Sequence, residues 1–151
     1  MPVSKRKLHT ALFLAYGAIM LWLLFNRPGY DPAVPYWEQV SRQLNLVPFR
    51  TLRLFVDLLD SGVRSHMMTA IINLGGNIIM FIPLGFLLPN VFPKLSSLPR
   101  VLLATAGIIV AVEVIQLFTL VGSCDIDDLI LNVLGAGLGY LIHNRIQKAA
   151  I

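Results

Sequence analysis

The chain has 151 residues, of which 56% are hydrophobic and only 13% are charged. Its mean hydropathy is +0.74. Because soluble domains have about 45–50% apolar and about 25% charged residues, this composition indicates an integral membrane protein. The length allows one compact unit, and we expect a single membrane domain over residues 1–151 without a second globular domain.

The cysteine count and the net charge exclude further classes. Cys124 is the single cysteine, which excludes an internal disulfide and a CxxC-type zinc site. The formal charge of +4 does not indicate nucleic acid, because basic residues of a membrane protein usually set its topology and meet anionic headgroups. We therefore expect the lipid bilayer as a partner and no nucleic acid.

Four apolar stretches are long enough to cross a hydrocarbon core about 30 Å thick. The first follows a basic start and resembles a signal peptide, but no small-x-small cleavage site precedes Pro28, so a retained span is favoured. The second contains Pro83, which removes a backbone hydrogen bond and predicts a kink. The predicted spans are about 8–26, 68–92, 100–121 and 126–143.

The first loop, residues 27–69, is the long segment outside these spans. Its start at 27–37 is rich in proline and aromatic residues and is expected to be extended or turned. From Leu52, apolar residues recur at i, i+3, i+4 and i+7, which predicts an amphipathic helix over about 49–60. This helix either lies on the membrane surface or packs on the spans. The predicted fold class is thus all-α, with four transmembrane helices plus a short amphipathic surface helix.

Basic residues predict the orientation of the chain. The N-terminus, the second loop and the C-terminus contain Lys and Arg but no Asp or Glu. Four spans place these three segments on one side, which the positive-inside rule makes cytoplasmic. The first loop and the turn at 123–128 are then outside.

Under this topology, polar residues of three spans reach a similar depth. Glu113 lies about 20 Å along the third span from Arg100 at 1.5 Å per residue, in the outer half of the core. Asn73 and Asn77 lie in the first turns of the second span, also in the outer half, and Asp127 and Asp128 begin the fourth span from the outside. Asn132 follows Asp128 by one helical turn on the same face. We therefore predict an outward-facing polar site.

Glu113 is the centre of this predicted site, because an acid within a span is costly and usually functional. Gln116 and Asn77 could orient a ligand headgroup. The alternative is structural, because such side chains also hydrogen-bond between helices and hold a bundle together. The sequence favours function for Glu113 and leaves Asn77, Gln116 and Asn132 open between the two interpretations.

The acidic turn is the second candidate. Asp125, Asp127 and Asp128 could hold a hard cation such as Mg²⁺ or Ca²⁺, although their spacing does not match an EF-hand loop. The alternative is that Asp127 or Asp128 caps the fourth helix. We favour function for both. No cofactor is predicted, since a divalent cation is supported by no specific motif.

Four sequence blocks resemble the VanZ-like family of small bacterial membrane proteins. They are NLVPFR (45–50), NLGGNIIMFIPLGFLLP (73–89), EVIQLF (113–118) and CDIDDLILNVLGAGLGY (124–140). The resemblance covers roughly residues 45–140. It implies an envelope protein linked to teicoplanin (glycopeptide) resistance and implies no established reaction. By position, the family's signature polar residues are Asn77, Glu113, Gln116, Asp125, Asp127, Asp128 and Asn132.

One departure from the family pattern concerns the acidic turn. Many members carry an arginine just before the acids, whereas this chain reads VGSCD there. A pairing between that arginine and the acids would need Arg50 or Arg53 instead. Arg50 therefore joins the predicted ligand-binding residues.

We expect a multi-pass protein of the bacterial cell membrane with both termini cytoplasmic. Its outward site is predicted to bind an envelope lipid, a lipid-linked glycan or a glycopeptide and to affect glycopeptide susceptibility. Two alternatives stay open. One is a metal-assisted enzyme that modifies a lipid headgroup, with Glu113 as general base. The other is a non-catalytic membrane scaffold that depends on the glycine faces of its helices.

Overall fold

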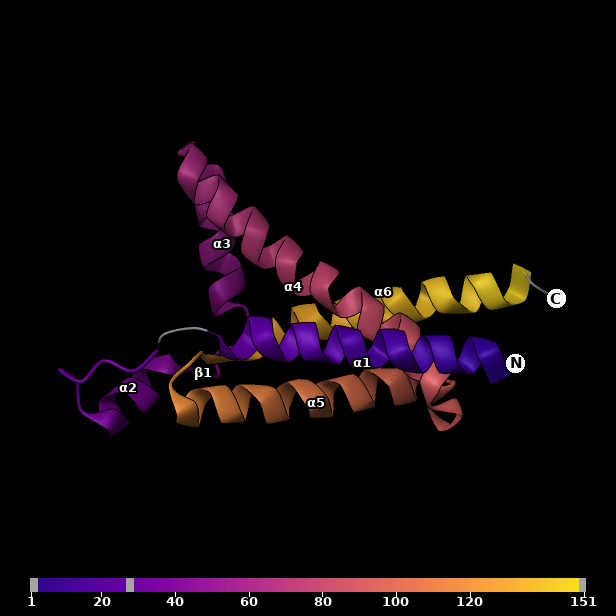
Figure 1. The fold of residues 1–151 in the computed structure, drawn as a ribbon. Helices are drawn as coiled ribbons and strands as arrows, with labels where there is room; N and C mark the ends of the chain where they lie inside the picture. Colours follow the sequence, from indigo (N-terminus) through magenta and orange to yellow (C-terminus); the bar gives the residue numbers. More distant parts are fainter. Residues whose placement is uncertain (1–2, 27–28, 150–151) are drawn as a thin grey trace.

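The computed structural model describes residues 3–26 and 29–149, which are mostly helical (Figure 1). The helices of this part of the chain are α1 (Val3–Phe25), α2 (Tyr36–Gln43), α3 (Arg50–Asp60), α4 (Arg64–Val91), α5 (Leu98–Thr119) and α6 (Ile126–Ala149). A short 3₁₀ turn, η1 (Pro93–Leu95), joins α4 to α5. Two-residue strands, β1 (Leu44–Asn45) and β2 (Cys124–Asp125), pair in parallel. The predicted all-α fold is confirmed.

Helices α1, α4, α5 and α6 are long and apolar enough to cross a membrane. Each of the four predicted spans falls on one of them, so the four-span prediction is confirmed. The helices extend beyond the spans at several ends, because helical hydrogen bonding continues into polar residues that a hydropathy window leaves out. Helix α4 begins at Arg64, and α6 continues to Ala149. Pro83 lies within α4 without ending it.

The helices alternate in direction along the bundle. The beginning of α1, the end of α6 and the α4–α5 connection lie at one end, and the α5–α6 turn lies at the other (Figure 1). An even number of membrane-length helices requires this grouping. The first loop, with α2 and α3, lies at the same end as the α5–α6 turn.

The contact between α4 and α6 is the most extensive between any two helices, and glycines make it close. A Cβ added at Gly135 would lie 2.1 Å from the carbonyl oxygen of Ile78, and one at Gly139 would lie 2.0 Å from that of Ile82. From the opposite helix, a Cβ at Gly85 would lie 1.8 Å from a carbonyl oxygen of α6. The two backbones therefore touch directly, as in other small-xxx-small helix pairs.

Helix α1 packs chiefly on α4. The Tyr16 hydroxyl donates a 2.8 Å hydrogen bond to the carbonyl oxygen of Met80. Near the end of α1, Gln116 Nε2 donates a 2.8 Å hydrogen bond to the carbonyl oxygen of Leu24, one of the C-terminal carbonyls that an α-helix leaves unpaired. These two bonds fix the middle and the end of α1 to the rest of the bundle.

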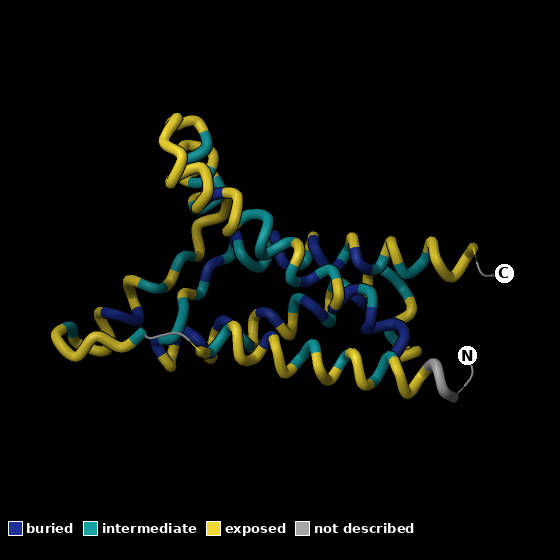
Figure 2. Tube along the Cα trace, turned by 45° about the horizontal axis from the view of Figure 1, so that its top comes forward, coloured by how far each residue is buried: buried dark blue, intermediate teal, exposed yellow. Residues whose placement is uncertain are grey.

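Helix α3 and the first turns of α4 project from the bundle as an arm (Figure 1), most of which is exposed (Figure 2). The predicted amphipathic helix at 49–60 is confirmed as α3, which packs on α4. Leu54 and Val56 of α3 and Ile71 and Ile72 of α4 are each more than half exposed. The arm therefore presents apolar side chains outward, as expected of a helix pair bordering lipid.

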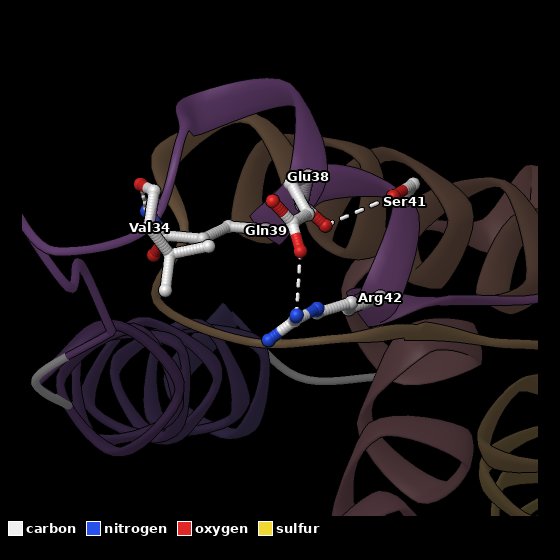
Figure 3. A network of polar contacts seen from close by, with 5 residues as sticks. All are labelled: Val34, Glu38, Gln39, Ser41 and Arg42. Carbon is white, nitrogen blue, oxygen red and sulfur yellow. Dashed lines mark hydrogen bonds and ion pairs between the residues drawn. The ribbon is translucent and has the colours of Figure 1, made fainter.

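Helix α2 is not predicted by the sequence analysis. Its first two residues, Tyr36 and Trp37, belong to the segment at 27–37 that was expected to be extended or turned, so this expectation is wrong for them, while residues 27–28 lie outside the described residues. Side chains of the helix itself stabilise it (Figure 3). Glu38 and Arg42 form an ion pair of 2.5 Å one turn apart. The buried Gln39 donates a 2.8 Å hydrogen bond from Nε2 to the carbonyl oxygen of Val34, which folds the preceding loop back onto the helix.

This helix covers the end of α5. Val40 packs with Leu117 and Leu120 in a small apolar cluster, and the Tyr36 hydroxyl donates a 2.8 Å hydrogen bond to the carbonyl oxygen of Phe118. Helix α2 therefore closes the bundle at the end where the α5–α6 turn lies.

The glycine contact gives a matched test on one helix. We expect Gly135→Ala and Gly139→Ala each to destabilise the protein by about 1–3 kcal/mol through overpacking. Gly137→Ala is the control, because its Cβ would lie 3.5 Å from the nearest atom and would gain up to about 1 kcal/mol in helix propensity. Thermal unfolding of the purified variants in detergent measures the difference. Equal midpoints for all three variants would contradict the close contact.

Candidate functional site

A cavity of about 240 Å³ lies between α1, α4, α5 and α6. Much of its wall is apolar and includes Phe13, Met20, Leu84 and Ile109. Its polar lining comes from the helix segments nearest the α5–α6 turn, so the cavity has one polar end. The predicted site residues at this end are Asn77, Glu113, Gln116, Asp128 and Asn132.

The polar end is organised by contacts between α4 and α6. Asn77 Nδ2 donates a 2.6 Å hydrogen bond to Asp128 Oδ1. Asn132 lies one turn beyond Asp128 and is only 7% exposed. Within the described part of the chain, Asn132 Oδ1 has no hydrogen-bond partner. Because nearly all buried polar atoms in proteins are paired, this oxygen is an acceptor available inside the cavity.

The α5 residues complete this polar end. Glu113 is 7% exposed, and the Cys124 thiol donates to its Oε2 over 3.8 Å. Burial and the nearby Glu113 carboxylate raise the pKa of the Cys124 thiol, so the thiol stays protonated near neutral pH. Gln116 is also buried, but its Nε2 is committed to the α1 carbonyl at Leu24.

Asp127 does not line the cavity. Its side chain is fully buried and accepts three backbone N–H groups at the start of α3. Phe49 N–H donates to Oδ1 at 2.6 Å, while Thr51 and Leu52 N–H donate to Oδ2 at 2.8 and 3.1 Å. Asp127 therefore caps α3, a helix distant in the sequence, by satisfying N–H groups that a helix start leaves unpaired.

This cap also holds a strained residue. Phe49 has a φ of 65°, a left-handed conformation that costs a non-glycine residue about 1–2 kcal/mol. Its N–H makes the shortest of the three bonds to Asp127. The buried carboxylate thus offsets the backbone strain that turns the chain into α3.

Asp125 joins the same network. Its Oδ2 accepts hydrogen bonds from the Thr51 hydroxyl at 2.5 Å and from Asn45 Nδ2 at 3.1 Å. Its Oδ1 accepts the backbone N–H of Asp127 at 2.8 Å. Beside it, Asn45 pairs with Asp125 in the small parallel sheet. Asp125 and Asp127 therefore anchor the first loop to the beginning of α6.

The structure brings together five of the eight predicted ligand-binding residues and places three elsewhere. Arg50 is the first residue of α3 and is exposed. The one ion pair found among the described residues joins Arg42 to Glu38, so Arg50 does not replace the missing family arginine at the acids. Hydrogen bonds from N–H and O–H groups stabilise Asp125 and Asp127 instead.

The acids of the turn are divided between two environments. Asp125 and Asp127 face the first loop, and Asp128 faces the cavity. No group of three His, Cys, Asp or Glu side chains in the described ranges is placed to hold a metal ion. The three acids stay untested as candidate ligands of a divalent cation, and the contacts on Asp125 and Asp127 lend such a role no support.

Sequence reasoning missed two parts of the site. Helix α1 supplies an apolar wall through Phe13 and Met20, for which an apolar span offers no signal. Thr51 and Asn45 partner Asp125. Asn45 lies in the NLVPFR block, which is one of the four that resemble the family. Its place in that block was the one feature of the sequence that could have indicated its contact with Asp125.

Four membrane-length helices around a cavity with one polar end define a small multi-pass helical membrane protein. A model of the VanZ/LLP1 family matches residues 13–147, and the chain belongs to this family. It is similar to Protein VanZ of Enterococcus faecium, with 27% identity over 141 residues that cover 93% of this chain and 76% of that protein. No solved structure matches the chain. The predicted resemblance is therefore confirmed.

The cap on α3 can be tested by removing acceptors in steps. Asp127→Ala leaves three N–H groups without their carboxylate, and a buried unpaired group costs about 1–3 kcal/mol. We expect faster hydrogen exchange over residues 49–60, with Asp127→Asn intermediate because it keeps one acceptor oxygen. Asp57→Ala, on the exposed side of α3, is the control. Unchanged exchange in Asp127→Ala would show that the cap does not hold the helix.

Proposed function

We propose that this VanZ-family membrane protein binds an amphiphile of the bacterial envelope in its cavity and thereby alters glycopeptide (teicoplanin) susceptibility. The ligand is an envelope lipid, a lipid-linked glycan or the membrane anchor of the antibiotic itself. One observation carries the proposal, namely a cavity with carboxylate and amide groups at one end and apolar side chains along the remainder. Such a cavity matches a ligand with a polar headgroup and an apolar tail.

The size of the cavity indicates that it encloses only part of the ligand. Sites that bury a whole drug-sized ligand measure about 300–1,000 Å³, whereas this cavity measures about 240 Å³. A headgroup and the first part of a tail fit such a volume, and the rest of the ligand stays in the bilayer. Helix α1 packs chiefly on α4 and touches α5 little, which favours entry from the membrane between α1 and α5.

The orientation is part of the same proposal. The beginning of α1, the end of α6 and the α4–α5 connection lie at one end of the bundle (Figure 1). These segments carry lysines and arginines without acids, which favours their cytoplasmic placement. The polar end of the cavity then faces the outer leaflet, where envelope lipids and glycopeptides meet.

Two carboxylate variants test the function. In a susceptible host that expresses the protein, we expect Glu113→Gln and Asp128→Asn each to return teicoplanin susceptibility to that of cells without the protein. The reason is that each variant replaces a carboxyl group of the cavity by an amide with little change in shape. The amount of protein in the membrane is measured in parallel and should be unchanged.

Asp57→Asn is the matched control, because it removes a carboxylate from the exposed side of α3. It should behave as the parent protein. If teicoplanin resistance and the amount of protein in the membrane are lost together in the cavity variants, Glu113 and Asp128 act through stability, and the binding proposal fails.

Labelling of Cys124 tests the orientation. We expect a membrane-impermeant maleimide to label it in intact cells, slowly at pH 7 and faster toward pH 8.5, because burial and Glu113 raise the pKa of the thiol and the thiolate is the reacting form. Ser123→Cys in a Cys124→Ala background is the control, since Ser123 is exposed and should label faster. Labelling only after the cells are opened would invert the topology.

A further inference from the structure

The hydrogen-bonding groups that the cavity offers to a ligand are mainly acceptors. Asn77 commits its Nδ2 to Asp128, and Gln116 commits its Nε2 to the α1 backbone. The acceptors left for a ligand include the Glu113 and Asp128 carboxyl groups and Asn132 Oδ1, and the Ser123 hydroxyl can donate or accept. A carboxylate has about four acceptor positions, so Asp128 can accept from a ligand in addition to its protein partners.

The buried Asn132 is an independent reason to expect a hydrogen-bond donor on the ligand. Asn132 is only 7% exposed, and it lines the cavity. Its Oδ1 accepts no hydrogen bond from the residues that the structure describes. A buried acceptor without a donor costs free energy. A ligand that brings a donor to this position would remove that cost and gain affinity.

The charge of the lining excludes the usual phosphate-binding chemistry. Phosphate groups are recognised by Arg, Lys or clustered N–H donors. Within the described chain, no Lys, Arg or His lines the cavity, whereas Glu113 and Asp128 do. Carboxyl oxygens accept hydrogen bonds from N–H groups, and an ionised carboxylate in a site of low dielectric repels an anion and attracts a cation.

We propose that the cavity selects amphiphiles whose headgroup carries a protonated primary amine. An ammonium group has three N–H donors and one positive charge, which match the two carboxylates and Asn132 Oδ1. The amine would lie at the polar end, and the tail would follow the apolar wall of α1. This inference rests on the proposed function and narrows it, because it names the headgroup chemistry of the same ligand.

The full chain in phosphatidylcholine nanodiscs gives the test. Isothermal titration calorimetry at pH 7 compares three ligands with twelve-carbon tails, dodecylamine, dodecyltrimethylammonium and dodecyl glucoside, with empty nanodiscs subtracted. Dodecylamine and dodecyltrimethylammonium carry the same charge, but the second has no N–H donor. We expect dodecylamine to bind about tenfold or more tightly than either of the others.

Variants locate the binding. Glu113→Gln and Asn132→Leu should each weaken dodecylamine binding about tenfold, and Asp57→Asn on α3 should leave it unchanged. Equal affinity for dodecylamine and dodecyltrimethylammonium would overturn the amine inference, and this comparison needs no variant that must fold.

The remaining outcomes separate the two proposals. Saturable binding of dodecyl glucoside alone, weakened by Glu113→Gln, would overturn the amine inference and leave the proposed function standing. Absence of saturable binding for all three ligands, or binding that no cavity variant changes, would overturn both. Saturable dodecylamine binding that responds to Glu113→Gln and Asn132→Leu, with discrimination against dodecyltrimethylammonium, supports both.

Discussion

The site depends on the direct backbone contact between α4 and α6. Gly135 faces the carbonyl oxygen of Ile78 at a distance that leaves no space for a side chain. Asn77 is the residue immediately before Ile78, so the same contact brings its amide within 2.6 Å of Asp128. In a membrane, hydrophobic burial does not drive helices together, and close packing of small residues replaces it. The polar end of the cavity is therefore positioned by residues that carry no polar side chain.

The three acids of the turn have different partners because they point in different directions. Asp127 and Asp128 are neighbours in sequence, but consecutive helical residues point about 100° apart because 3.6 residues make one turn. Asp127 consequently faces the start of α3, and Asp128 faces Asn77 and the cavity. Asp125 precedes the helix and supports the first of these two environments through Asn45 and Thr51. The turn thus fixes the first loop and also supplies one carboxyl group to the cavity.

Hydropathy and helical spacing were sufficient to predict the four spans and α3, because these features depend on local sequence. Depth along the spans likewise grouped Glu113 with Asn77, Gln116, Asp128 and Asn132. It could not separate Asp127 from Asp128, since the partners of Asp127 lie more than 70 residues away. Helix α2 has eight residues, fewer than the roughly 12–15 that an isolated helix needs, and it depends on contacts with the end of α5. Helix α1 is apolar on all sides, so no pattern indicated which face borders the cavity.

The distance in sequence between α3 and its cap has a consequence for biosynthesis. Phe49 and Asp127 are 78 residues apart. At a synthesis rate of ~5–20 residues per second, about 4–16 s pass between the appearance of α3 and that of the carboxylate that holds it. During this interval the first loop has neither its cap nor its strand partner at Cys124. The loop can reach its final conformation only after the last span has been delivered to the membrane, so insertion of α6 is the step that completes assembly of the protein.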